Sequence, residues 1–170
     1  VDRKKFFGKY HAYIDRTDAQ ERSTLYVCGE GSEVPSWQRF SRPEGISIGE
    51  ATRIHETAFL RLSMPNFEGK PRIVIGDHCE IGAGSTLTAV QRIEFGNSVS
   101  VAENVHIKDY VYDDSGIGLL PKDCAIVTKE GGVKIERGVR LEENVSIKGA
   151  VRIGRGSIVK AGSTVCTDIP

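Results

Sequence analysis

The sequence predicts an all-β fold in which short parallel strands stack into a prism with three faces. Large apolar residues recur mostly every six residues, and the repeat is interrupted only between complete groups of three units. Six residues is neither a helical period nor simple alternation, so we interpret each unit as a short strand followed by a bend. These large apolar residues, here named anchors, are Ile48, Ile54, Leu60, Ile75, Ile81, Leu87, Phe95, Val101, Ile107, Ile135, Leu141, Ile147, Ile153, Val159 and Val165.

The fourth position of the units predicts the corners of the prism. Glycine and asparagine recur there, and these residues adopt a left-handed backbone at low cost. His78 occupies the same position in its unit, and histidine is also enriched at positive φ, so we expect His78 to form a corner. The glycine and asparagine corners are Gly84, Asn104, Gly138, Asn144, Gly156 and Gly162.

The interruptions predict loops that leave the prism at its corners. They lie at 66–74, around Ile93 and at 113–134, and each follows a complete group of three units. A single unit cannot bury its apolar side, whereas stacked units bury one another. The groups predict about five coils.

Residues 1–44 do not carry the repeat, and we expect them to cap one end of the prism, because an uncovered strand edge invites association. Residues 3–20 have apolar residues at near-helical spacing, and 23–29 are typical of a strand. The predicted organisation is therefore a cap segment at 1–44 and a prism at 45–170, with an extended loop at 113–134.

Composition excludes several functional classes. The 23 basic and 23 acidic residues give a net charge of zero, so no bulk charge attracts nucleic acid or an anionic membrane. No stretch approaches the roughly 20 apolar residues of a membrane span, and we see no signal peptide. The four cysteines form no CxxC pair, which is typical of a reduced cytoplasmic protein without a zinc site. We expect a cytoplasmic protein with no nucleic-acid partner, no integral membrane segment and no metal.

Residues 45–170 resemble the hexapeptide-repeat acyltransferases. The resemblance rests on the stretch from Ile75 to Asp109 and on the stretch from Pro121 to Pro170, which includes Ala161-Gly162-Ser163. It is closest to the sugar O-acetyltransferases of surface-polysaccharide pathways. It implies a left-handed parallel β-helix that works as a homotrimer, with acetyl-CoA as donor and a sugar as acceptor. The loop at 113–134 matches the position of the active-site loop in that branch.

The resemblance also indicates where a catalytic base would lie. In the sugar branch a histidine of an Asp-His-x-His segment removes the acceptor proton, whereas this chain reads Asp109-Tyr110-Val111-Tyr112. A tyrosine with a pKa near ~10 is a poor base at pH 7, although Tyr110 could hydrogen-bond a substrate. His106 precedes the anchor Ile107 and should face outward, either as a displaced base or as an ordinary surface histidine. The candidate catalytic residues are His106, Asp109, Tyr110 and Tyr112.

The same resemblance places the acetyl-CoA groove beside the last coils. Backbone amides of Ala161 and Gly162 match those that hold the pantetheine arm in the family. Lys160 is a nearby cation that could serve the phosphates or could be a solvated corner. Family positions that hold tryptophan, a small residue and lysine are occupied here by Arg140, Glu143 and Thr167 respectively.

Three functions follow from these observations. The first is transfer of an acetyl group from acetyl-CoA to a sugar hydroxyl or amine. The second is a non-catalytic β-helix scaffold or regulatory subunit, which the missing histidines and the altered groove favour. The third, ranked last, is a metal-dependent γ-class carbonic anhydrase, which needs three converging histidines. His55, His78 and His106 fall in units of different faces or distant coils.

Overall fold

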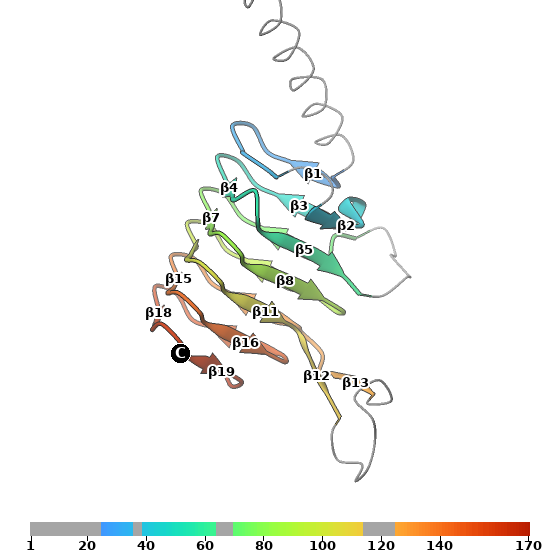
Figure 1. Cartoon of the computed structure of the whole chain (residues 1–170), viewed down its shortest axis with the longest axis vertical. Coiled ribbons are helices and arrows are strands. Elements are labelled where there is room, and N and C mark those ends of the chain that lie inside the picture. Colours follow the sequence, from blue (N-terminus) through green and yellow to red (C-terminus); the bar gives the residue numbers. More distant parts are fainter. Residues whose placement is uncertain (1–24, 36–38, 64–69, 114–124) are drawn as a thin grey trace, which may run out of the picture.

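The computed structural model describes residues 25–35, 39–63, 70–113 and 125–170, which build a three-sided prism of stacked parallel strands (Figure 1). The three faces, named here sheets A, B and C, contain six, five and six strands. Sheet A consists of β1 (Val27–Cys28), β3 (Ile46–Ile48), β6 (Ile73–Ile75), β9 (Ile93–Phe95), β14 (Val133–Ile135) and β17 (Val151–Ile153). Sheet B consists of β4 (Arg53–Ile54), β7 (Glu80–Ile81), β10 (Ser100–Val101), β15 (Arg140–Leu141) and β18 (Ile158–Val159). Sheet C consists of β2 (Phe40–Ser41), β5 (Phe59–Leu62), β8 (Thr86–Ala89), β11 (His106–Lys108), β16 (Ser146–Lys148) and β19 (Thr164–Val165).

The predicted repeat is confirmed by the burial of the anchors. All fifteen are buried, and the most exposed of them, Val165 at the last coil, has a relative exposure of 7%. The first, second and third anchors of every group lie in sheets A, B and C respectively. The five strands of sheet B match the five predicted coils. The apolar core therefore runs along the axis of the prism.

The predicted corners are also confirmed. All six glycine and asparagine corners have positive φ, and His78 has a φ of 55°. Gly84 has a second constraint, because a Cβ at this position would collide with Oδ1 of Asn104 in the next coil. The corner sequence thus satisfies both the backbone conformation and the close stacking of coils.

The described part of the predicted cap forms a further, partial turn at one end of the prism. β1 pairs with β3, Glu33 forms a bridge with Arg53, and β2 pairs with β5. A short 3₁₀ helix, Pro43–Gly45, leads from this turn into β3. Leu25 and Phe40 join the apolar core. Residues 1–24, including the helix expected at 3–20, lie outside the described residues.

The interruptions of the repeat share one corner, between sheets C and A, which we name the C–A corner. They follow β5, β8 and β11. After β11 the chain forms a hairpin arm in which β12 (Tyr110–Tyr112) pairs antiparallel with β13 (Ile126–Thr128) and projects from the prism (Figure 1). The expected loop at 113–134 therefore contains β13 and the start of β14, while residues 114–124 lie outside the described residues.

Candidate functional site

The outward side chains of sheet C form two columns, because strands in register place equivalent positions above one another. The first, here named the hydroxyl column, contains Thr86, His106, Ser146 and Thr164. The second, here named the cationic column, contains Arg61, Thr88, Lys108 and Lys148. Both columns run along the prism on the same face.

His106 faces outward from β11, as predicted, and is exposed. Its Nδ1 lies 2.7 Å from Oγ1 of Thr86, the neighbouring residue of the hydroxyl column. In the tautomer with the proton on Nδ1, the ring donates to Thr86 and leaves the lone pair of Nε2 for a substrate proton. The pairing thus orients the imidazole as a general base requires.

His55 provides a comparison within the same molecule. It is exposed next to β4, and its Nδ1 lies 3.0 Å from Oγ1 of Thr57. That hydroxyl also accepts a hydrogen bond from the amide of Gly84, so it belongs to a corner rather than to an outward column. The described residues contain no group of three or more His, Cys, Asp or Glu side chains placed to hold a metal.

Asp109 has a structural role that the sequence did not indicate. Its side chain has a relative exposure of 0%. Oδ1 accepts a hydrogen bond from the amide of Val90 at 2.8 Å, and Oδ2 accepts from those of Gln91 and Arg92 at 2.6 Å each. Burial raises the pKa of Asp109, and the three amides oppose that rise. Because the carboxylate is buried and its hydrogen bonds hold the preceding turn of the C–A corner, we reassign Asp109 from catalysis to the corner.

Tyr110 and Tyr112 surround the ammonium group of Lys108. The two rings meet edge to face with centroids 5.6 Å apart, and Lys108 Nζ lies 5.3 Å and 5.2 Å from the Tyr110 and Tyr112 centroids. Burial, followed by interaction with Tyr112, raises the pKa of Tyr110. The Tyr110 phenol is therefore protonated at neutral pH and does not act as a base. The pair instead fixes Lys108 by cation–π contacts where β11 enters the hairpin arm.

The predicted coenzyme A residues meet only in part. Glu143, Lys160, Ala161 and Gly162 lie around one corner between sheets B and C, whereas Arg140 faces outward from sheet B and Thr167 is exposed beyond β19. Lys160 Nζ forms an ion pair with Glu142 at 2.9 Å, and the amide of Ala161 donates to the same carboxylate at 3.0 Å. The amide of Gly162 donates to the Glu143 carbonyl.

Glu142 therefore occupies two of the donors that were expected to hold the cofactor, Lys160 and the Ala161 amide. Its hydrogen bond with Lys160, followed by that with the Ala161 amide, lowers the pKa of the Glu142 carboxyl. The carboxylate is thus ionised at neutral pH and competes with any anion at this corner.

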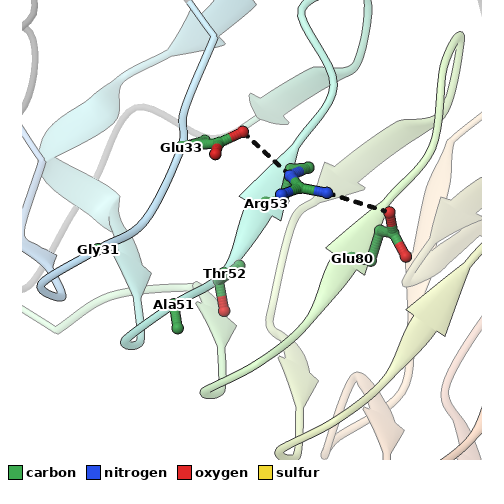
Figure 2. Close-up of a pocket in the computed structure, with 6 residues that line it drawn as sticks. All are labelled: Gly31, Glu33, Ala51, Thr52, Arg53 and Glu80. Atoms are coloured by element: carbon green, nitrogen blue, oxygen red, sulfur yellow. Dashed lines mark hydrogen bonds and ion pairs between the residues drawn. The ribbon is translucent and has the colours of Figure 1, made fainter.

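A recess on sheet B contains an arginine between two glutamates and no histidine (Figure 2). It is lined by Gly31, Glu33, Ala51, Thr52, Arg53 and Glu80. Arg53 extends between the two carboxylates, 3.0 Å from Glu33 and 4.0 Å from Glu80. The recess has a volume of about 200 Å³, below the usual size of small-molecule sites, and its one cation, Arg53, is already paired with two carboxylates.

Four residues of sheet C were missed by sequence reasoning, although the anchor frame contains the signal. Thr86 lies one position before an anchor, like His106. Arg61, Lys108 and Lys148 each lie one position after a sheet C anchor. Aligning these outward positions from coil to coil would have revealed both columns.

Curated proteins from several organisms are similar in sequence to this chain. No family model matches the chain. It is 27% identical over 129 residues to the bifunctional protein GlmU of Thermosipho africanus, covering 75% of this chain and 25% of that protein. It is 32% identical over 107 residues to UDP-3-O-acylglucosamine N-acyltransferase of Methylorubrum extorquens, covering 58% of this chain and 28% of that protein. The chain thus spans between a quarter and two fifths of the length of the curated relatives it matches.

Two solved structures are similar to the prism. A mutant of AntD, an N-acyltransferase from Bacillus cereus in complex with dTDP-4-amino-4,6-dideoxyglucose and coenzyme A, superimposes with a TM-score of 0.73 at 23% identity, covering 90% of this chain and 80% of that chain. The hexapeptide-repeat acetyltransferase VCA0836 of Vibrio cholerae, complexed with acetyl-CoA, gives 0.54 at 24% identity, covering 92% and 69%. These likenesses confirm the left-handed β-helix fold.

Proposed function

We propose that this chain, which belongs to the hexapeptide-repeat family of left-handed β-helix proteins, transfers an acyl group from a coenzyme A thioester to a sugar. An acetyl group from acetyl-CoA is the proposed donor group, and surface-polysaccharide biosynthesis is the proposed setting. Because two of the similar proteins are N-acyltransferases, we propose a sugar amine rather than a hydroxyl as the acceptor group. Within the described ranges the structure contains no helix able to cross a membrane.

The observation that carries this proposal is the oriented imidazole on sheet C. His106 is held through Nδ1 by Thr86 at 2.7 Å, and the residue is exposed. Along the described strands of sheet C, no outward position carries a carboxylate. An anionic donor and a nucleotide-linked acceptor would meet no repulsive charge there.

The proposed reaction is direct transfer. The acceptor nitrogen or oxygen attacks the thioester carbonyl while Nε2 of His106 removes its proton. Collapse of the tetrahedral intermediate breaks the carbon–sulfur bond, and the departing thiolate takes the proton from His106. The products are the acylated sugar and coenzyme A, and no covalent bond to the enzyme forms.

The remaining site residues support this reaction in proposed roles. Tyr110 and Tyr112 hold Lys108, and Tyr112, which is exposed, would contact the acceptor. Lys160, Ala161 and Gly162 would hold coenzyme A from the neighbouring corner once Glu142 releases its two donors. Arg140, Glu143 and Thr167 would border the same groove. A homotrimer, as the resemblance implies, would place a second prism against these residues.

The alternative function, a non-catalytic scaffold, is favoured by Glu142. This carboxylate accepts from both Lys160 and the Ala161 amide, so the expected cofactor donors satisfy an internal acceptor instead. A chain that has lost coenzyme A binding would tolerate this arrangement. The alternative predicts an intact prism that does not bind the donor.

One experiment separates the two functions. The protein is titrated with coenzyme A by calorimetry and then incubated with acetyl-CoA and dTDP-4-amino-4,6-dideoxyglucose. We expect binding, release of free thiol, and a product heavier by one acetyl group in mass spectrometry. Absence of binding at millimolar coenzyme A would establish the scaffold. Binding without thiol release, across amino-sugar and hydroxyl acceptors, would also contradict an acyltransferase.

A further inference from the structure

We infer that the cationic column binds the diphosphate of a nucleotide-linked sugar. The residues of sheet C alone support the binding of a diphosphate. The assignment of that diphosphate to a nucleotide-linked sugar rests on the proposed function. The inference assigns Lys108 and Lys148, with Arg61 two strands away from Lys108, to phosphate recognition.

The first support is an unfavourable pairing of like charges. Lys108 and Lys148 are direct register partners on neighbouring strands, about 4.8 Å apart along the stack. Like charges at such positions destabilise a sheet. Among the described residues no carboxylate forms an ion pair with Arg61, Lys108 or Lys148. A bound anion would remove the repulsion that the protein leaves in place.

The second support is the contrast with the other two faces. On sheet B, Arg53 pairs with carboxylates of both neighbouring coils. On sheet A, Lys134 and Arg152 are also register partners, but Glu136 accepts hydrogen bonds from Arg152. Arg53 of sheet B and Arg152 of sheet A are therefore neutralised by carboxylates of the same chain. Among the described residues, the cations of the cationic column have no such carboxylate.

The third support is the fixed position of Lys108. Its ammonium group lies over both Tyr110 and Tyr112, at 5.3 Å and 5.2 Å from the ring centroids. A cation held in this way loses little conformational freedom when a phosphate binds. The Thr88 hydroxyl, between Arg61 and Lys108 in the column, adds a donor for phosphate oxygens.

The distance to His106 identifies the source of the diphosphate. Lys108 lies two residues after His106 on β11, about 6.6 Å along the strand. In a nucleotide-linked sugar the ring is attached directly to the terminal phosphate, so its acceptor group falls within this short span. In coenzyme A the whole pantetheine arm separates the diphosphate from the thioester, and this arm is too long for the same span. The column therefore fits the acceptor rather than the donor.

The test variant is Lys148→Gln. The control is Lys134→Gln, which removes one outward lysine from sheet A instead of sheet C. Binding of pyrophosphate, dTDP and coenzyme A is measured by calorimetry for both variants and for the unchanged protein. We expect Lys148→Gln to lower the affinity for pyrophosphate and for dTDP by about tenfold. The affinity for coenzyme A should fall by less than twofold. Lys134→Gln should leave all three unchanged, and Lys148→Arg should restore dTDP binding.

Two outcomes would overturn the inference. Equal affinities in Lys148→Gln and the unchanged protein would remove the column as a diphosphate site. If only the affinity for coenzyme A falls, the column binds the donor, which contradicts its assignment to the acceptor. If dTDP binding depends on Lys148 while no acyl transfer occurs with any acceptor, the column stands and the proposed acyltransferase function fails.

Discussion

Sheets B and C present the same interior and opposite exteriors. Both bury one anchor per coil against the common axis. Outside, Arg53 of sheet B lies between two carboxylates, whereas sheet C places Lys108 directly beside Lys148 and lines His106 with hydroxyls. The difference shows that stacking constrains only the inward positions of this fold. The outward positions are free to differ, and there we locate the chemistry.

The strongest test of this comparison removes the histidine of each face in turn. We expect His106→Gln to lower kcat by about 10²–10⁴-fold, because a general base contributes that much to proton transfer. His55→Gln is the matched control, since His55 is also exposed with Nδ1 against a threonine hydroxyl. Turnover measured by thiol release should be unchanged in that control. Equal losses in both variants would show that position on sheet C carries no special role.

The second prediction concerns the carboxylate at the end of a sheet C strand. Asp109→Ala should lower the free energy of unfolding by about 3 kcal/mol, because three amides lose their acceptor. Asp168→Ala is the control: this exposed carboxylate follows β19 and accepts from the amide of Arg152. Its loss should cost about 1 kcal/mol. Urea unfolding monitored by circular dichroism measures both, and similar losses would contradict the corner role of Asp109.

The third prediction separates a threonine that orients a histidine for catalysis from a threonine that stabilises the fold. Thr86→Val should lower kcat about five- to tenfold, with the KM for acetyl-CoA unchanged, because Nδ1 of His106 loses its partner. Thr86→Ser should restore the rate. On the sheet B side, Thr57→Val should leave turnover unchanged but cost about 1 kcal/mol of stability, because the Gly84 amide loses its acceptor. A normal rate in Thr86→Val would remove the orienting role.

The smallest effect is a pH dependence at Glu142. Lys160 and the Ala161 amide lower the pKa of this carboxyl in the folded state. A lowered pKa contributes stability above the unfolded pKa and loses it as the pH falls through the folded pKa. The difference in unfolding free energy between the unchanged protein and Glu142→Gln should therefore be largest at neutral pH and should close on acidification. Glu143→Gln is the control, and a gap that widens at low pH would contradict the assignment.

The sequence predicted the features that depend on one residue and its immediate surroundings. The anchors are buried because they are large and apolar, and corners such as Gly84 and His78 adopt positive φ because their residue types permit it. The outward orientation of His106 followed from its place beside Ile107. Each of these depends on a local rule that repeats along the chain.

The roles of Asp109 and Glu142 required the register between coils. Thr86 and His106 are 20 residues apart, whereas Glu142 and Lys160 are 18 apart. A single period therefore does not align every pair, because the interruption around Ile93 shifts part of the chain. Tyr110 was likewise unpredictable, since its burial accompanies its pairing with β13 in the hairpin arm. Contacts between coils, rather than residue types, set these roles.

The interruptions of the repeat all leave from the C–A corner, and this has a consequence for engineering. The entropic cost of closing a flexible loop rises by only about 0.6 kcal/mol for each doubling of its length. Inserts of very different size can therefore be grafted at this one edge while the stacked strands keep their alignment. The hairpin arm beside Lys108 is one such insert and could be replaced by another. Under the proposed function, we expect an exchange of this arm to alter acceptor binding, because its Tyr110 and Tyr112 hold Lys108.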